Sequence, residues 1–147
     1  MIWNKKTAGE VRICVDLRKL NNACFSNQLP TPFTNEVLEN VEGKEMYSFT
    51  NVFSGYHQVR ITKEDHHKTT FVTEWGCYQY MGMPFGLKNA PTIFSRIVVS
   101  AFKYFIHKFL EVYFDDWTVF GLVRDHIENL HMMLERCCQY QIALNLR

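Results

Sequence analysis

The chain has 147 residues, of which 47% are hydrophobic and 21% are charged. This composition excludes a disordered chain and predicts a globular unit with a continuous core. The five cysteines include no CxxC pair, which indicates buried thiols in a reducing compartment and excludes a disulfide framework or a zinc site. No run of 18 apolar residues and no signal-type segment occurs, so we expect an intracellular protein, cytoplasmic or nuclear, with no membrane partner.

The formal net charge of +1 gives no argument for a nucleic-acid partner, but the charge is unevenly distributed. Residues 1–20 carry five cations against two acids, which leaves a net charge of +3 in this segment. Such a segment can contact phosphates, or it can be a solvated N-terminus. Charge alone does not distinguish these two interpretations.

In chain order, the first predicted elements are a strand and a short helix. Residues 11–15 alternate and are rich in β-branched side chains, which predicts a strand. Two prolines predict an extended connection over residues 28–32. Thr34 is a good N-cap for a following helix that Gly43 would end. The apolar face of that helix would hold Val37, Leu38 and Val41.

The middle of the chain is predicted to hold four strands and a longer helix. The strands are expected over residues 46–50, 57–61, 69–73 and 77–81. A turn at Trp75–Gly76 would join the last two. The apolar residues between 89 and 105 recur at helical spacing, which predicts a helix.

The last third of the chain predicts a hairpin, a helix and a final strand. Two strands, 109–114 and 117–120, are separated only by Asp115 and Asp116. Asp125 and Glu128 form a capping-box pattern for the next helix. The core stripe of that helix would hold Ile127, Leu130, Leu134 and Cys137. A short strand is expected over residues 142–146, and the mixture of elements predicts an α+β domain with an antiparallel sheet backed by helices.

The adjacent carboxylates of Asp115 and Asp116 are the most informative pair in the sequence. Two-residue hairpin turns prefer Asn-Gly or Asp-Gly, so two repelling aspartates fit this position poorly. A hard divalent cation with oxygen ligands would compensate for the repulsion. The alternative is a solvated turn with two exposed acids, and local chemistry gives the two interpretations about equal weight.

A glycine-containing loop opens the predicted long helix. Residues 83–91 read MPFGLKNAP, and the free N–H groups of such a helix start can face an anion. Many loops precede helices in this way, so the loop alone indicates little.

Four segments together resemble reverse transcriptases. Tyr113-Phe114-Asp115-Asp116 resembles the YxDD box of that family. MPFGLKNAP is similar to the MPFGLxNAP box of the gypsy class of long-terminal-repeat retroelements, whose VDYRKLN and SGYHQI segments resemble residues 15–21 and 54–59. The segments occur in the order of the family, and the similarity extends over about residues 11–147.

The resemblance implies a right-hand polymerase of α+β class, built of fingers and palm. About residues 1–45 and 57–82 would form the fingers, and residues 46–56 and 83–147 the palm. The chain 1–147 leaves no room for a thumb, so we expect a fingers-and-palm fragment. In this family two Mg²⁺ ions held by three palm aspartates support the transfer of a nucleotide to a primer. Asp115 and Asp116 match two of these metal ligands.

The resemblance also assigns residues that would bind the substrates. Lys5 and Arg12 would hold the incoming triphosphate. Tyr56 would be the aromatic gate that crowds a ribose 2′-hydroxyl, although ordinary core packing is an alternative for this side chain. Phe85, Gly86 and Tyr113 would line the nucleotide and template pocket. The expected partners are an RNA or DNA template with its primer and a deoxynucleoside triphosphate (dNTP).

One position departs from the family pattern. Counted back from Tyr56, the first catalytic aspartate would stand where this chain has Asn51. The amide offers a carbonyl oxygen but lacks the charge that normally bridges both ions. Because Mg²⁺ gives up its water reluctantly, we expect the catalytic activity to be weak or absent, with Mn²⁺ as a substitute ion to test.

Three interpretations of the function therefore remain open. The first is an RNA-directed DNA polymerase domain of a retrotransposon Pol polyprotein that keeps some activity. The second is a catalytically dead remnant that binds nucleic acid, and the third is a structural subunit. We also expect self-association through bare apolar surface near Trp117 or near Met132 and Met133.

Overall fold

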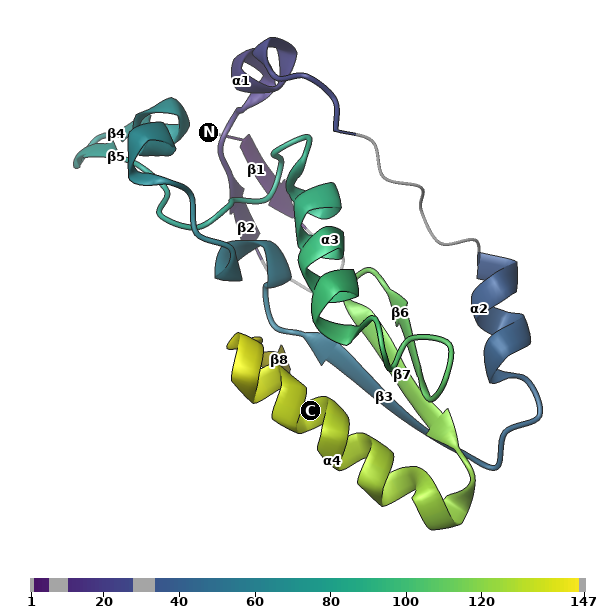
Figure 1. The fold of residues 1–147 in the computed structure, drawn as a ribbon. Coiled ribbons are helices and arrows are strands. Elements are labelled where there is room, and N and C mark those ends of the chain that lie inside the picture. The colour runs from purple at the N-terminus through teal and green to yellow at the C-terminus, as the bar shows by residue number, and fades with distance from the viewer. Residues whose placement is uncertain (1, 6–10, 28–33, 146–147) are drawn as a thin grey trace. The chain divides into compact units, whose positions relative to one another are not determined.

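The computed structural model describes residues 2–5, 11–27 and 34–145, and for residues 2–5, 11–14 and 34–35 the backbone alone. The chain divides into two compact units (Figure 1). Unit 1 comprises Met1–Gln28 and Tyr56–Thr92, and unit 2 comprises Leu29–Gly55 and Ile93–Arg147. Each unit is described by itself.

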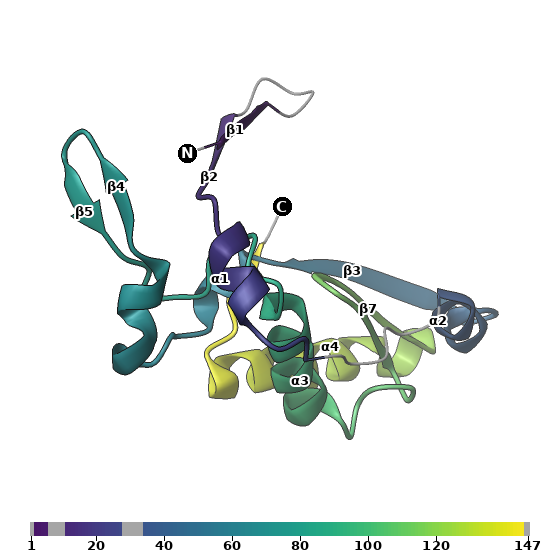
Figure 2. The same ribbon diagram turned by 90° about the horizontal axis from the view of Figure 1, so that it is seen from above.

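Unit 1 is built of short elements. Strand β1 (Ile2–Lys5) pairs antiparallel with β2 (Val11–Cys14), which confirms the first predicted strand. A short helix that the sequence did not predict, α1 (Arg18–Ala23), follows β2. Later in the chain, β4 (Phe71–Thr73) and β5 (Gly76–Tyr78) form a narrow antiparallel hairpin (Figure 2).

The strand predicted over residues 57–61 is wrong. The 3₁₀ turn η1 (Gly55–Gln58) occupies the start of this stretch, and Arg60 forms only an isolated bridge with Gly82. Gly82 permits this close approach, because a Cβ atom there would lie 2.2 Å from the carbonyl oxygen of His57. The 3₁₀ segment η2 (Lys63–Thr69) was also missed. Strands β4 and β5 are confirmed but shorter than predicted, and their turn lies at residues 74–75.

Unit 2 is centred on a four-stranded antiparallel sheet in the order β6-β7-β3-β8. Its strands are β3 (Met46–Val52), β6 (Leu110–Tyr113), β7 (Asp116–Gly121) and β8 (Leu144–Asn145). Helix α4 (Val123–Tyr140) packs along β7 and β3, and α2 (Thr34–Val41) lies beside β6 (Figure 1). Helix α3 (Ala90–Phe102) begins in unit 1 and continues into unit 2.

The core of unit 2 lies on one face of this sheet. Trp117 and Val119 of β7 point into it, and the Phe102 ring of α3 meets the Trp117 ring edge-on at 4.9 Å between centroids. Residues of a strand alternate between faces, so Thr118 and its cross-strand neighbour Phe49 lie on the opposite face. Phe49 is exposed there, which shows that this second face is largely open.

The structure corrects several predictions about side chains in unit 2. Helix α4 begins at Val123, and its first N–H bonds to Glu45 Oε2 at 3.0 Å, so the predicted capping box of Asp125 and Glu128 does not cap it. Cys137 is buried as predicted, but Ile127 and Leu134 are exposed, and His126 and Met133 fill the core instead.

Of the side chains expected to expose apolar surface, Trp117 and Met133 are fully buried, whereas Met132 is partly exposed. The helix predicted after Thr34 is confirmed as α2, but Leu38 faces outward. The extended connection predicted over residues 28–32 lies outside the described residues. None of the helices in the described part of the chain is long and apolar enough to span a membrane.

Candidate active site on the β6–β7 hairpin

The tip of the β6–β7 hairpin carries the aspartate pair. The turn consists of Phe114 and Asp115, whereas Asp116 is already the first residue of β7, one position earlier than the sequence predicted. Phe114 has a φ of +53°, a left-handed conformation that is rare for a bulky residue. The indole N–H of Trp117 donates to the Phe114 carbonyl at 3.2 Å, so the buried core anchors this turn.

Asp115 points its carboxylate toward the protein. Its Oδ1 is buried and has no hydrogen-bond partner among the described residues. A Cβ atom on Gly55 would lie 3.1 Å from this oxygen and 2.8 Å from the ring of Phe94, so only glycine fits beside it. Burial, and then the charge of Asp116, raises the pKa of Asp115 above its usual value. A buried carboxylate oxygen without a partner is suited to a cation.

Asn51 and Asp116 face each other across β3 and β7. They are register partners, and the Asn51 amide nitrogen donates to Asp116 Oδ1 at 2.8 Å. The next backbone N–H, of Val52, donates to the carbonyl of Asp115 at 2.8 Å. The structure therefore brings together the three positions that the sequence assigned to catalysis. At the third position it places an N–H donor where a carboxylate was expected.

The aspartate pair fits a hard divalent cation, but only in part. Carboxylate oxygens are the ligands that Mg²⁺ prefers, and Asp115 offers an oxygen with no other described partner. No three His, Cys, Asp or Glu side chains among the described residues gather into a metal-binding cluster. Asn51, at the position where a third carboxylate was expected, contributes no negative charge because its side chain is a neutral amide, and this amide bonds to Asp116.

Tyr113 lies next to this pair. It is the register partner of Asp116 on β6, so the two side chains share a face of the sheet. Its ring is exposed at the hairpin end and meets the Phe114 ring edge-on at 5.0 Å. A planar group could stack on Tyr113 close to the carboxylates.

The remaining predicted pocket residues belong to unit 1. The rings of Tyr56 and Phe85 meet edge-on with centroids 5.4 Å apart, and His57 packs on Phe85 at 5.1 Å. Gly86 follows with a φ of +94°, which favours glycine. The structure thus gathers Tyr56, Phe85 and Gly86 into one aromatic corner.

Asn21 also belongs to this corner, although the sequence motifs did not assign it a role. Its amide nitrogen donates to the Gly86 carbonyl at 2.7 Å, and its Oδ1 accepts the N–H of Lys88 at 2.8 Å. Asn89 makes a second pair of such bonds, to Phe25 O at 2.8 Å and from Asn27 N at 3.0 Å. These side-chain amides hold the loop over residues 84–89 against α1 and the residues that follow it. The only signal in the sequence was that Asn21 ends the segment VDLRKLN.

The two predicted phosphate-binding cations lie in the first hairpin. Lys5 is the last residue of β1, and Arg12 lies in β2 opposite Asn4. Their side chains are outside the described part of the chain.

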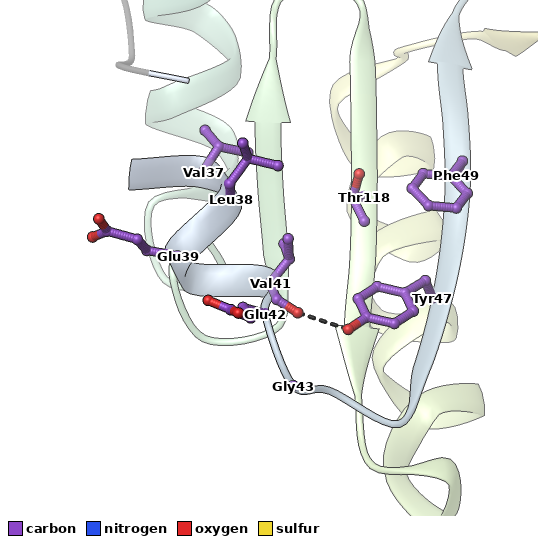
Figure 3. A pocket seen from close by; sticks show the side chains of 9 residues that line it. All are labelled: Val37, Leu38, Glu39, Val41, Glu42, Gly43, Tyr47, Phe49 and Thr118. Atoms are coloured by element: carbon purple, nitrogen blue, oxygen red, sulfur yellow. Dashed lines mark hydrogen bonds between the residues drawn. The ribbon is translucent and has the colours of Figure 1, made fainter. Parts of the chain in front are cut away.

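A groove of about 800 Å³ opens on the second face of the unit 2 sheet (Figure 3). It lies between Val37, Leu38 and Val41 of α2 and the side chains of Tyr47, Phe49 and Thr118. The Tyr47 hydroxyl donates to the Val41 carbonyl at 2.7 Å and closes one side (Figure 3). Its lining is mainly apolar, with Glu39 and Glu42 as its charged members, so it suits packing rather than catalysis.

Comparison with known proteins identifies the family of the chain. The family model described as "Reverse transcriptase (RNA-dependent DNA polymerase)" matches residues 3–147. The Pol polyprotein of transposon opus from Drosophila melanogaster is 33% identical over 93% of this chain. The enzymatic polyprotein of cauliflower mosaic virus, strain CM-1841, is 35% identical over 96% of it. The chain spans only 14% and 21% of the length of these two relatives.

A solved structure shares the fold. The foamy viral protease–reverse transcriptase in complex with double-stranded DNA superposes with a TM-score of 0.88 at 22% identity, over 97% of this chain and 25% of that one. The expected α+β right-hand polymerase fold is thereby confirmed. The match of the family model covers nearly the whole chain, and the chain belongs to the reverse transcriptase family.

Proposed function

We propose that the chain is the fingers and palm of an RNA-directed DNA polymerase from a gypsy-class retrotransposon Pol, and that Asn51 impairs its catalysis. In this proposal the fingers comprise about residues 1–45 and 57–82 and the palm residues 46–56 and 83–147. The two compact units divide the chain differently, mainly at residues 29–45 and 83–92. The observation that carries the impairment is the hydrogen bond of 2.8 Å from the Asn51 amide to Asp116. It occupies a carboxylate oxygen that a cation would need.

Asp115 and Asp116 would hold the divalent ions, two Mg²⁺ by analogy with the family, with Mn²⁺ as a substitute. When bound, such ions lower the pKa of the attacking hydroxyl and neutralise the charge of the leaving pyrophosphate. The buried Oδ1 of Asp115, which has no described hydrogen-bond partner, supports this role.

Other residues would bind the dNTP and the template with its primer. The Tyr56–Phe85 corner would contact the sugar and base of a dNTP, with Gly86 leaving room for them. Lys5 and Arg12 would contact the triphosphate, and the exposed Tyr113 would stack near the primer end. The DNA-bound state of the foamy viral relative supports a nucleic-acid partner.

The expected impairment is large. Asn51 removes one of three negative charges from a site that must hold doubly charged ions. A loss of about 3 kcal/mol in transition-state stabilisation corresponds to more than about a hundredfold in rate. We therefore expect the natural chain to add nucleotides slowly or not at all.

Addition of a single nucleotide to a primer on an RNA template tests this function. Three proteins are compared, each with Mg²⁺ and with Mn²⁺: the natural chain, Asn51→Asp, and Asn51→Asp combined with Asp115→Asn. We expect extension by Asn51→Asp and its loss when Asp115→Asn is added. If the natural chain extended the primer as fast as Asn51→Asp does, the proposed impairment would be contradicted. If none of the three proteins extended the primer, the polymerase function would be contradicted.

A second candidate function is a remnant that binds nucleic acid or serves as a structural subunit without catalysis. The hydrogen bond between Asn51 and Asp116 favours it, because the amide takes a carboxylate oxygen that an ion would need. Fluorescence polarisation with a labelled primer–template separates the two functions. Tight binding by all three proteins, without extension by Asn51→Asp, would favour the remnant.

The cellular context is also a proposal. The protein would be intracellular, cytoplasmic or nuclear, either within a longer Pol polyprotein or in a retroelement particle. Fractionation of cells that express a tagged chain tests this location.

A further inference from the structure

Helix α4 carries an apolar stripe that its own core does not use. Val123, Ile127, Leu134 and Cys138 lie within about 60° of arc on the helix surface. Val123 is 59% exposed, Ile127 69% and Leu134 38%, and Cys138 is exposed as well. The buried side of the same helix is formed by His126, Met133 and Cys137. The apolar surface of α4 is therefore wider than the part that the sheet covers, and such surface marks an interaction site.

One flank of this stripe carries an ordered set of charges. Arg124, Glu128, His131 and Glu135 lie side by side along this flank, and all four are exposed. The basic residue is near the start of the helix, an acidic one is near its end, and Glu128 and His131 stand between them. If a second copy of this flank runs in the opposite direction, each basic residue of one copy lies opposite an acidic residue of the other.

We propose that α4 pairs antiparallel with α4 of a second copy of this chain, about a twofold axis. In a twofold contact, residue i meets residue j and residue j meets residue i. In this arrangement Ile127 of one copy lies opposite Leu134 of the other. Arg124 then faces Glu135, and Glu128 faces His131. The twofold axis makes each of these pairs occur twice. In a parallel arrangement this flank of the two helices would lie on opposite sides of the contact, so these charges would have no partner across it. The charges therefore select the antiparallel pair.

The contacts that these charges make within one chain do not compete strongly. Arg124 approaches Asp125 at 3.4 Å, and His131 approaches Glu135 at 3.8 Å. Exposed pairs of this kind contribute little to stability, so they can rearrange. The stripe is about 22 Å long at 1.5 Å per residue, which is a small contact and predicts a weak, concentration-dependent dimer.

Sedimentation velocity of the chain over a range of concentrations tests the pairing. The expected result is a monomer–dimer equilibrium that Ile127→Glu weakens at least tenfold. Val72→Glu is the matched control, because Val72 is an equally exposed apolar residue, 73%, in the β4–β5 hairpin of unit 1. Circular dichroism checks that each variant keeps its fold. A chain that stays monomeric, or a dimer that Ile127→Glu leaves intact, would overturn the proposal.

A charge exchange tests the antiparallel direction. Arg124→Glu and Glu135→Arg should each weaken the dimer, because each leaves two like-charged pairs across the contact. The double variant Arg124→Glu/Glu135→Arg should restore the dissociation constant of the natural chain, because both pairs are again opposite in sign. Failure of the double variant to improve on the single ones would overturn the antiparallel arrangement.

Discussion

The side-chain amide of Asn51 donates a hydrogen bond of 2.8 Å to Oδ1 of Asp116, its register partner on β7. A carboxylate can only accept, so the donor must be the nitrogen of the amide and its orientation is fixed. The amide thus takes one oxygen of the aspartate pair and ties β3 to β7 at the end of the sheet that carries this pair. The hairpin is held in place here by a neutral donor.

Replacing Asn51 should make the protein responsive to metal. Asn51→Asp removes the hydrogen bond and adds a third carboxylate, so without divalent ions the free energy of unfolding should fall by about 1–2 kcal/mol. Mg²⁺ or Mn²⁺ should then raise the melting temperature more than in the natural chain, because an ion that binds only the folded state stabilises it. Thermal melts with and without a chelator measure both effects. Asn22→Asp, on α1 in unit 1, is the control. If divalent ions did not raise the melting temperature of Asn51→Asp, the proposed metal site would be contradicted.

Asp115 should lower the stability of the fold at neutral pH. Burial raises its pKa above the usual 3.8, so the folded state holds this proton more tightly than the unfolded state does. Below 3.8 both states are protonated and the penalty is absent. As the pH rises through the window above 3.8, the natural chain should lose stability relative to Asp115→Asn. Denaturant unfolding from acid to neutral pH measures the difference, with the exposed Asp125→Asn as control, and parallel curves would refute the prediction.

Gly55 should be sensitive to a single methyl group. In Gly55→Ala the new Cβ would lie 2.8 Å from Phe94 Cζ and 3.1 Å from Asp115 Oδ1, and overpacking of this kind costs about 1–3 kcal/mol. Phe94→Leu shortens the obstructing side chain, so the double variant should be more stable than the sum of the two single effects. Denaturant unfolding of the natural chain, the two single variants and the double variant gives the free energies for this double-mutant cycle. Strict additivity would show that Gly55 and Phe94 do not meet as described.

The sheet of unit 2 and its aspartate pair could be predicted because their signals are local. Strands β3, β6 and β7 come from apolar, β-branched runs, and the adjacent Asp115 and Asp116 stand out within such a run. The hydrogen bond from Asn51 could not be predicted in this way, since it joins residues 65 positions apart. Only the pairing of β3 with β7 brings them together.

Helix α4 shows why periodicity alone misplaced two side chains. Its apolar residues cover a wide arc of the helix surface. The helical spacing of Ile127 and Leu134 fits a core face, and the spacing of Met133 and Cys137 fits one equally well. The sheet covers only one part of that arc, and its position is fixed by strands far away in the sequence. Likewise, the capping pattern of Asp125 and Glu128 is local, whereas the side chain that caps the helix, Glu45, precedes β3 and lies 78 positions earlier in the chain.

Loss of Glu45 should destabilise the start of α4. Its carboxylate accepts the N–H of Val123 at 3.0 Å and places a negative charge at the positive end of the helix. Glu45→Ala should therefore cost about 0.5–2 kcal/mol of unfolding free energy, as loss of an N-cap does. Glu128→Ala, which removes the predicted but unused capping residue, should change it by less than about 0.5 kcal/mol. Chemical denaturation at low protein concentration compares the two, and a larger effect of Glu128→Ala would reverse the assignment.

Asn21 should control the loop that carries Phe85 and Gly86. Its Oδ1 accepts the Lys88 N–H at 2.8 Å, and a hydrogen bond worth about 1.4 kcal/mol corresponds to about tenfold faster amide exchange when it is lost. Asn21→Ala should accelerate hydrogen exchange at Lys88 by that factor. Asn21→Asp should keep Lys88 protected, because it retains the acceptor and loses only the donor to Gly86.

Nucleotide addition provides a second measurement of this loop. In the Asn51→Asp background, Asn21→Ala should raise the KM for the dNTP more than it lowers kcat, because the loop positions Phe85 while the carboxylates stay unchanged. Asn22→Ala, the neighbouring exposed position on α1, should leave both the exchange and the KM unaltered. Unchanged protection of Lys88 in Asn21→Ala would show that the backbone holds the loop without this side chain.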